Sequence, residues 1–497
     1  MIEAIVVLAM LLGGCLFVLR AGIGGWAVPV LGYVAGTCLL IDFGFLQIIS
    51  GLPTAPTLTL SLTVAAPLCW WLSGREPRYF PYSAIQVAAT LLAVICLVYF
   101  FRKANLVGWS NDTLRYLETG ALIASDNFDY VTPNLLAYRL LAFPIVHAPA
   151  NLAGEFYLRS AGPLLAISGI GLFVWLSFTG LAPRRTYGPV VFTALGVLLL
   201  VSSNRMLWSA FALFPHLLTA VLFLLIAGAG WLIATTGDRA ENSDIDPRAL
   251  IALQSIAIPA LVVARAEGGL MVALAILPTL LCRGVAPEYR AFLLGVFGAA
   301  LAAWNLLLLT RLPANAEVPA SVLGPLALAV LSLVAASLLY WRKVQKHITV
   351  LEDRSALILL AAEGALWLAL AAAAIWKPDV LLRSISATTQ NLLYGSGGWG
   401  YSLIVLGLLV LICAVAARGS ELIFLRFPVT SFVPLGFLLP YFRGGGYRIG
   451  VGDSLNRMWI HIVPLAVLFV VAAASSDCWR GLPSMLSQWK FKLRSPE

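Results

Sequence analysis

The sequence predicts an all-α protein: a polytopic transmembrane helical bundle of about 13–15 spans, with interfacial helices in one long external loop. Composition is the first observation, because 61% of the 497 residues are hydrophobic and 11% are charged, against roughly a quarter charged in soluble domains. Apolar runs also recur along the whole chain, and each span must be helical because unpaired backbone groups are costly in lipid. The alternating ten-residue segments of membrane barrels are absent from the sequence.

About fifteen hydrophobic segments are predicted as spans, most of them close to the roughly 20 residues that a bilayer requires. They are Ile2–Leu19, Trp26–Ile41, Ala55–Leu72, Ala84–Phe101, Gly162–Leu181, Pro189–Val201, Ala210–Ile233, Leu250–Ala264, Gly268–Leu281, Phe292–Leu309, Ala320–Tyr340, Ala356–Trp376, Tyr401–Ala416, Val429–Tyr441 and Trp459–Ala474. We interpret the first as a membrane helix, because no basic region precedes it and no cleavage site follows it. A single membrane domain over 1–497 is the simplest partition.

The basic residues predict the orientation of these spans. If the Met1 end lies outside and the spans alternate, about nineteen of the 32 lysines and arginines fall at inside ends. Basic residues accumulate on the cytoplasmic side of membrane proteins. We therefore predict that the Glu497 end is cytoplasmic and that the loop over 102–160 is external.

Composition also excludes several classes of site. The seven cysteines are scattered and form no CxxC pair, so neither a zinc site nor a disulfide framework is predicted. The net charge of +9 comes from residues at the ends of apolar runs. Because no basic cluster is interleaved with aromatics, we predict no nucleic-acid partner.

The loop over 102–160 carries the candidate active site. Four acids, Asp112, Glu118, Asp126 and Asp129, fall within about eighteen residues of a chain that is poor in charge. Ser110, Asn111 and Asp112 are all able to cap a helix. The apolar residues that follow recur at helical spacing and predict an amphipathic helix on the membrane surface; they are Leu114, Leu117, Ala121 and Leu122. A second apolar stretch, Leu135–Val146, is too short to span, so we expect it at the interface or re-entering the membrane.

The acids of this loop allow more than one interpretation. Asp112 at headgroup level is placed to accept the proton of an incoming hydroxyl, as a general base, or it only caps its helix. Asp126 and Asp129 belong to the site or form a turn before Pro133. Glu118 belongs to the site or pairs with Arg115 one turn away.

Several of these segments resemble the GT-C superfamily of integral-membrane glycosyltransferases. The order of an outside acid at a helix start, an acidic turn, a proline and Tyr138-Arg139 is similar to the first external loop of that family. Arg205-Met206-Leu207-Trp208-Ser209 with His216 is similar to a later helix, and Ala264-Arg265-Ala266-Glu267-Gly268 to the start of another. Leu455–His461 with Pro464 resembles the arginine-led last helices. The resemblance implies that Asp112 is the catalytic base and that the sugar carbon is inverted.

Arginines near the outer ends of the spans are candidate phosphate ligands, since guanidinium pairs well with phosphate oxygens. Arg265 is the first, with an Arg265–Glu267 pair as the alternative. Arg205 begins a span, where an anchor in the interface is the alternative. The glycine-rich loop Phe442–Asp453 supplies Arg443 and Arg448, and glycine lets backbone N–H groups approach an anion; a plain connector is the alternative. Arg457 and His461 share a helix face, and His461 is otherwise a core residue.

The function expected from these features is transfer of a sugar from a polyprenyl-phosphate donor to a glycan, lipid or protein of the cell envelope. Asp112 is the predicted base, and Arg265, Arg448 and Arg457 the predicted ligands of the donor phosphate. The second group of candidates comprises Glu118, Asp126, Asp129, Arg205, His216, Glu267, Arg443 and His461. A divalent cation, Mg²⁺ or Mn²⁺, is an open expectation without a visible ligand set. The expected location is a bacterial inner membrane, with the site on the periplasmic face.

Two other functions remain alternatives to transfer. A transporter or flippase of a lipid-linked glycan would show broken helices and inverted repeats. An envelope polysaccharide polymerase or ligase would share the surface site and differ in its acceptor.

Overall fold

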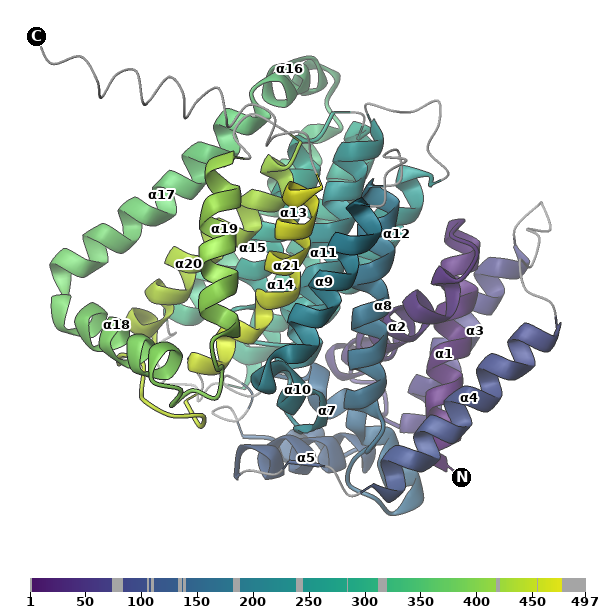
Figure 1. Cartoon of the computed structure of the whole chain (residues 1–497). Coiled ribbons are helices and arrows are strands. Elements are labelled where there is room, and N and C mark those ends of the chain that lie inside the picture. Colours follow the sequence, from purple (N-terminus) through teal and green to yellow (C-terminus); the bar gives the residue numbers. More distant parts are fainter. Residues whose placement is uncertain are drawn as a thin grey trace, which may run out of the picture.

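A computed structural model describes residues 2–73, 84–104, 107–108, 111–132, 136, 140–181, 188–237, 245–283, 285–311, 320–416, 421–453 and 455–475. Within these ranges the regular structure is helical (Figure 1), and β pairing is limited to an isolated bridge between Gly108 and Ala212. The prediction of an all-α fold is confirmed.

The helices follow one another along the chain with short connections. They are α1 (Ile2–Ala21), α2 (Ala27–Ser50), α3 (Pro56–Leu72), α4 (Ala84–Lys103), α5 (Asn111–Ala124), α7 (Ala142–His147), α8 (Ala161–Leu181), α9 (Gly188–Ser202), α10 (Asn204–Phe211), α11 (His216–Gly237), α12 (Pro247–Val262), α13 (Gly268–Leu281), α14 (Pro287–Thr310), α15 (Ala320–Leu339), α16 (Arg342–Asp353), α17 (Ser355–Trp376), α18 (Pro378–Leu393), α19 (Ser402–Ala416), α20 (Ile423–Phe442) and α21 (Val463–Ala474). Three 3-10 helices are η1 (Phe128–Tyr130), η2 (Ala148–Ala153) and η3 (Asn456–His461).

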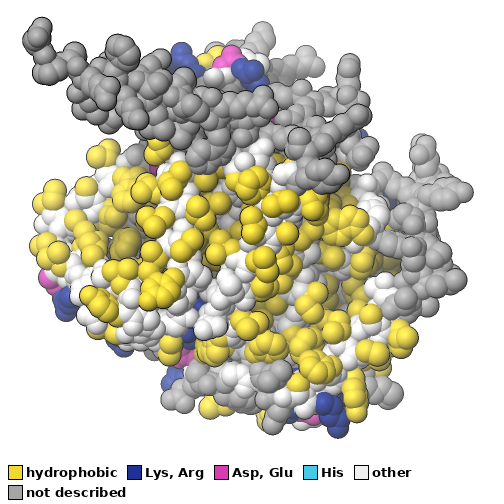
Figure 2. All heavy atoms as spheres, in the orientation of Figure 1, with side chains coloured by type: hydrophobic (Ala, Val, Ile, Leu, Met, Phe, Trp, Pro, Cys, Tyr) yellow, Lys and Arg dark blue, Asp and Glu magenta, His cyan; other side chains and the backbone are white. Residues whose placement is uncertain are grey.

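The protein is an integral membrane protein. In the described part, nine helices are long and apolar enough to cross a membrane, namely α1, α2, α8, α11, α14, α15, α17, α20 and the continuous η3–α21 segment. Helices α9 and α10 are long and apolar enough only when taken together, and they are bent by 69° at the break between them, as in a broken span or a re-entrant loop. Helices α3, α12, α13 and α19 are apolar but shorter. Figure 2 shows hydrophobic side chains across the middle of one face and charged ones near its upper and lower edges.

Each of the predicted spans falls on a helix, but several boundaries differ. Helix α2 extends nine residues beyond the predicted end, and α14 and α20 begin five and six residues before the predicted starts. One predicted span also crosses a break. The segment predicted from Ala210 to Ile233 contains the end of α10 and a break, and α11 begins at His216. Pro215 explains the break, because proline lacks an N–H group and disfavours helical backbone in the residue before it. The break places Arg205 on a short helix of its own.

The stretch Leu135–Val146, which was expected at the interface or re-entering the membrane, is buried within the protein where it is described. Every residue of α7 is buried, and the Ala142 N–H group donates a hydrogen bond of 3.0 Å to the Val263 carbonyl. Helix α7 therefore packs against the junction between α12 and α13, inside one end of the bundle.

Helix α11 forms the centre of the bundle, and its apolar window is completely buried. Helices α1 and α2 pack against each other through glycines. A Cβ atom at Gly36 would lie 1.8 Å from the Met10 carbonyl oxygen, a distance that no two such atoms can reach. Close backbone contact of this kind is typical of helix pairs in membranes.

The helices that do not span mark the two ends of the bundle. Helices α5, α7 and α10 lie at one end and α16 lies at the other (Figure 1). We call the first of these the α5 end. The candidate residues Asp112 and Arg205 belong to α5 and α10, and so to this end.

Candidate functional site

Helix α5 presents Asp112 in its first turn. The helix is held by a buried face that consists of Thr113, Tyr116 and Leu117. Leu114, which the sequence placed on the apolar face, is 55% exposed, so the predicted face was partly wrong. The helix turns a mixed face toward the bundle because the groups that it meets there are charged.

Gly120 lets α5 approach α7. A Cβ atom at this position would lie 3.0 Å from the Pro144 carbonyl oxygen, which is tighter than an ordinary contact. The glycine that weakens an isolated helix thus permits the packing that fixes α5 on the bundle.

Asp112 forms an ion pair with Arg457. The Asp112 Oδ2 atom lies 3.2 Å from Arg457 Nη2, although the two residues are 345 positions apart. The Arg457 side chain is 6% exposed and that of Asp112 is 33% exposed. The Arg457 guanidinium also lies over the ring of Phe214, 4.5 Å from its centroid. Asp112 therefore stands at the open edge of a buried cationic group.

A second ion-pair group lies at the junction between α12 and α13. Glu267 is 1% exposed and accepts hydrogen bonds from Arg265 Nε at 3.0 Å and from Arg443 Nη2 at 3.1 Å. Burial would raise the pKa of Glu267, but Arg265 and Arg443 lower it to about 2. Glu267 is therefore ionised at neutral pH, and the predicted Arg265–Glu267 pair is present.

Tyr116 connects this group to α5. Its hydroxyl is a hydrogen-bond partner of the Arg265 guanidinium, and its ring contacts Phe143 of α7 with centroids 5.4 Å apart. The pKa of Arg265 is raised, since Glu267 and Tyr116 outweigh the opposing effect of burial. Asp112 and Tyr116, the hydrogen-bond partner of Arg265, thus lie one turn apart on α5.

Arg205 brings a fourth guanidinium to the same place. It extends from α10, donates a hydrogen bond of 2.5 Å from Nη2 to the Val451 carbonyl, and lies 4.8 Å from the centroid of Trp208. Its charge interacts with that of Arg457. Because Arg205 is 3% exposed, it is a buried residue, and the prediction of a surface anchor is not supported.

We call these six residues the charged cluster: Asp112, Arg205, Arg265, Glu267, Arg443 and Arg457. Four guanidinium groups meet two carboxylates, so the cluster carries two more positive charges than negative ones. Positive charge that is taken out of water is costly unless it is paired. The arrangement therefore favours an anionic ligand, and phosphate and carboxylate are the anions that a guanidinium group can bind through two parallel hydrogen bonds.

Two histidines complete the site. His216 Nδ1 and His461 Nε2 lie 3.0 Å apart, and His461 Nδ1 lies 4.0 Å from Glu267 Oε1. The two side chains are at most 2% exposed. His461 is therefore a core residue, as one interpretation had it, and it also borders the charged cluster, as the other had it.

The glycine-rich loop is tied down by two asparagines. Asn391 donates to the Arg448 carbonyl at 2.9 Å and accepts from the Gly450 N–H group at 2.8 Å. Asn456 accepts from Trp399 Nε1 at 3.2 Å. Asn456 also donates to the Gly450 carbonyl at 3.4 Å, so the loop meets Trp399, which lies between α18 and α19, at the α5 end (Figure 1). Arg443 and Arg448 are both exposed. Arg443 pairs with Glu267 in the charged cluster, whereas Arg448 forms no ion pair with the described residues.

Three of the four acids also lie outside the charged cluster. Asp126 Oδ1 accepts hydrogen bonds from Thr54 N and Oγ1 at 2.8 and 3.2 Å, and the Asp126 backbone has a positive φ of 57°. Of the two interpretations of Asp126, a site residue or a turn former, the structure supports the turn former. The Asp129 side chain is 90% exposed and pairs with Arg311 at 2.7 Å. Both follow the C-terminal end of α5, which lies about 20 Å along the helix axis from Asp112.

Glu118 is exposed. Among the ion pairs of the described residues, none joins it to Arg115, so that pairing was wrong. Tyr138 and Arg139, which contributed to the family resemblance, lie outside the described residues.

The described residues do not fit a metal ion. They contain no group of three or more His, Cys, Asp or Glu side chains that could hold one. The expectation of a divalent cation therefore has no support from the described donor set.

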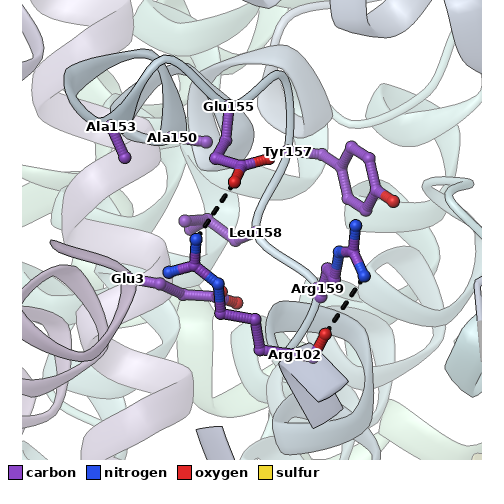
Figure 3. Close-up of a pocket in the computed structure, with 8 residues that line it drawn as sticks. All are labelled: Glu3, Arg102, Ala150, Ala153, Glu155, Tyr157, Leu158 and Arg159. Atoms are coloured by element: carbon purple, nitrogen blue, oxygen red, sulfur yellow. Dashed lines mark hydrogen bonds and ion pairs between the residues drawn. The ribbon is translucent and has the colours of Figure 1, made fainter. Parts of the chain in front are cut away.

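Two pockets adjoin this end of the bundle. An apolar cavity runs between α2, α7, α8 and α11 and shares Phe214 with the surroundings of Arg457. The other pocket, shown in Figure 3, is polar: Arg102 pairs with Glu155 at 3.0 Å, and Arg159 donates to the Arg102 carbonyl at 3.0 Å. Glu3 accepts from Ser160 at its wall. Its charges balance, so it does not favour an anion as the charged cluster does.

Sequence reasoning missed several residues of the site. Tyr116, Phe214 and Asn456 were not selected, because aromatic and amide side chains in apolar segments are common in any membrane helix. The one available signal was the position of Asn456, which stands next to Arg457 at the start of a span and could have been selected with it.

Comparison of the chain with protein-family models, with curated proteins and with solved structures found no match.

Proposed function

We propose that this protein is a membrane glycosyltransferase that takes a sugar from a polyprenyl-phosphate donor and passes it to an acceptor of the cell envelope. The observation that carries the proposal is the convergence of four arginines with two carboxylates at one end of the bundle. Such a site suits a lipid-linked phosphate, whose charge lies at the depth where spans end. The family resemblance in the loop, α10 and η3 points the same way.

In the proposed reaction Asp112 takes the proton of the acceptor hydroxyl. The hydroxyl oxygen then attacks the anomeric carbon of the sugar from the side opposite the phosphate, and the bond between that carbon and the phosphate oxygen breaks. The polyprenyl phosphate leaves as an anion, which the arginines stabilise. Inversion at the sugar carbon follows from attack on the opposite side.

The ion pair between Asp112 and Arg457 has a role in this scheme. A carboxylate held by a guanidinium is ionised but is a weak base. A donor phosphate that binds Arg457 competes with Asp112 for the same Nη2 group. Binding of the donor would therefore release Asp112 for proton transfer, so the base is active only when the donor is present.

The apolar cavity borders the site, but its volume of about 30 Å³ is too small for an isoprene unit of the lipid chain. Its wall includes Phe143, Phe214 and Leu217. We also infer that the α5 end faces the outside of a bacterial inner membrane, because the distribution of basic residues predicts that side.

Replacement of Asp112 by Asn tests the proposal. We expect turnover of polyprenyl-phosphate sugars by the Asp112→Asn protein to fall about 10²–10⁴-fold, the usual contribution of a general base, while donor binding persists. Glu118→Gln is the matched control, because Glu118 lies on the same helix and is exposed. Wild-type turnover by Asp112→Asn would remove the base assignment.

Transport of a lipid-linked glycan is a second candidate, favoured by the break between α9 and α10. The two helices bend by 69°, and Arg205 follows the break directly. Broken helices at a binding site are typical of transporters. Purified protein in vesicles that moves labelled glycolipid between leaflets without transferring sugar would establish this function instead. If a sugar product forms, its mass separates single transfer from polymerisation or ligation.

A further inference from the structure

A carboxylate and two imidazoles form a chain through the buried side of the charged cluster. Glu267 is followed by His461 at 4.0 Å, and His461 is followed by His216 at 3.0 Å. The three residues come from the α12–α13 junction, the end of η3 and the start of α11. The proposed reaction does not use this chain, although all three residues are nearly inaccessible to solvent.

The charge of Glu267 determines which nitrogen of His461 carries the proton. Glu267 is ionised, since Arg265 and Arg443 hold its pKa at about 2, and a carboxylate can only accept. His461 Nδ1 faces it and has no hydrogen-bond partner. A lone pair at Nδ1 would face negative charge, so the N–H group belongs there. His461 Nε2 then carries the lone pair.

The hydrogen bond with His461 determines which nitrogen of His216 carries the proton. With a lone pair on His461 Nε2, the 3.0 Å contact is a hydrogen bond only if His216 Nδ1 is the donor. The guanidinium groups of Arg205, Arg265 and Arg457 lie around this contact. A neutral His216 ring that carries its single proton on Nδ1 presents a lone pair at Nε2.

We propose that His216 Nε2 is a hydrogen-bond acceptor for a hydroxyl group of the substrate, set in that state by Glu267 through His461. This rests on the proposed function, in which the substrate carries sugar hydroxyls. The four arginines of the charged cluster can only donate. Glu267 is held by Arg265 and Arg443, and Asp112 is taken up by the acceptor hydroxyl in the proposed reaction. A sugar hydroxyl that enters needs an acceptor, and His216 supplies one among donors. His461 and Glu267 act as positioning residues.

The tautomers can be measured directly in the full-length protein. The chain has four histidines, so ¹⁵N-histidine labelling in lipid nanodiscs gives few signals, and His147→Gln and His347→Gln variants assign two of them. His147 is an internal reference, because its Nδ1 accepts from the Leu158 N–H group at 3.0 Å and its proton must lie on Nε2. We expect His216 and His461 in the opposite form, with the proton on Nδ1.

A variant tests the relay itself. In His461→Phe we expect His216 to lose its preference for Nδ1–H, since its acceptor is gone. A His216 signal with the proton on Nε2 in the wild type, a doubly protonated ring, or an unchanged tautomer in a folded His461→Phe protein would each overturn the relay.

The contact with a hydroxyl is tested by adding lipids to the labelled wild-type protein. Polyprenyl phosphates that carry hexoses or pentoses should move the His216 Nε2 resonance further than sugar-free polyprenyl phosphate does, because the phosphate alone changes only the charge near the ring. An equal change with both lipids, or none with any sugar although the lipids bind, would overturn the contact. Absence of polyprenyl-phosphate binding would overturn the proposed function and the contact with it, while the tautomers would still decide the relay.

Discussion

Arg443 and Arg448 show how the role of a residue depends on the direction of its side chain. Both belong to the same glycine-rich loop, and both were predicted to contact substrate. Arg443 binds Glu267 at 3.1 Å, whereas the Arg448 side chain is exposed and only its carbonyl is held, by Asn391. The bonds that Asn391 makes to the backbone fix the loop, and they are not visible in the spacing of the arginines.

The same difference makes Arg448 a control for the proposed phosphate site. We expect Arg457→Gln to weaken binding of polyprenyl phosphate about 10–100-fold, because a hydrogen bond to a charged group contributes about 1.5–3 kcal/mol. Arg448→Gln should change it less than twofold. Native mass spectrometry of the protein with added lipid phosphate measures both. Equal losses in the two variants would argue for a diffuse surface charge and against a specific site.

The lowered pKa of Glu267 predicts that the stability of the protein depends on pH. Its pKa is lowered from 4.5 to about 2, so the native state binds this proton less readily than the unfolded state does. The stabilisation is fully present above pH ~4.5 and is lost as the pH falls toward ~2, about 3 kcal/mol in all. Thermal unfolding in detergent between pH 5 and 2 should show this loss.

Substitution of Glu267 isolates its contribution to the loss of stability at low pH. Glu267→Gln should lack that part of the pH dependence and be less stable at neutral pH, because Arg265 and Arg443 are left unpaired. Glu118→Gln, at an exposed site, should retain the wild-type profile. A wild-type profile in Glu267→Gln would show that other carboxylates account for the acid response.

At the scale of elements, α5 shows the limit of hydrophobic periodicity. The spacing of Leu114, Leu117 and Ala121 predicted the helix correctly but not the face that is buried. Thr113 and Tyr116 are buried and Leu114 is exposed, because the helix docks on arginines and on α7. Periodicity reports burial in an apolar core, and a helix beside a charged cluster departs from it.

The α1–α2 pair allows a test of packing between elements. We expect Gly36→Ala to destabilise the protein by about 1–3 kcal/mol, as overpacking does, since the added Cβ would lie 1.8 Å from the Met10 carbonyl oxygen. Gly407→Ala in α19 has nothing within 4 Å and should be neutral or slightly stabilising. Thermal unfolding in detergent compares the two, and equal stability would contradict the close contact.

At the scale of the molecule, the two ends of the bundle carry a prediction about topology. The α5 and α16 ends lie opposite each other (Figure 1). In a protein without its seven native cysteines, we expect Glu118→Cys to react with an impermeant thiol reagent on intact cells. Arg354→Cys, at the end of α16, should react only after permeabilisation. Labelling of both from the same side would contradict the arrangement, and reversed labelling would contradict the orientation.

The sequence by itself determined the class of the protein and the position of its helices, because hydropathy is a local property that each segment of about 20 residues carries alone. It also selected all six members of the charged cluster, since charge beside a span is costly and therefore conspicuous. Only the tertiary structure decided which of these charges meet. Asp112 and Arg457 are 345 positions apart, and a contact between them depends on how the helices pack and where the loops fold back.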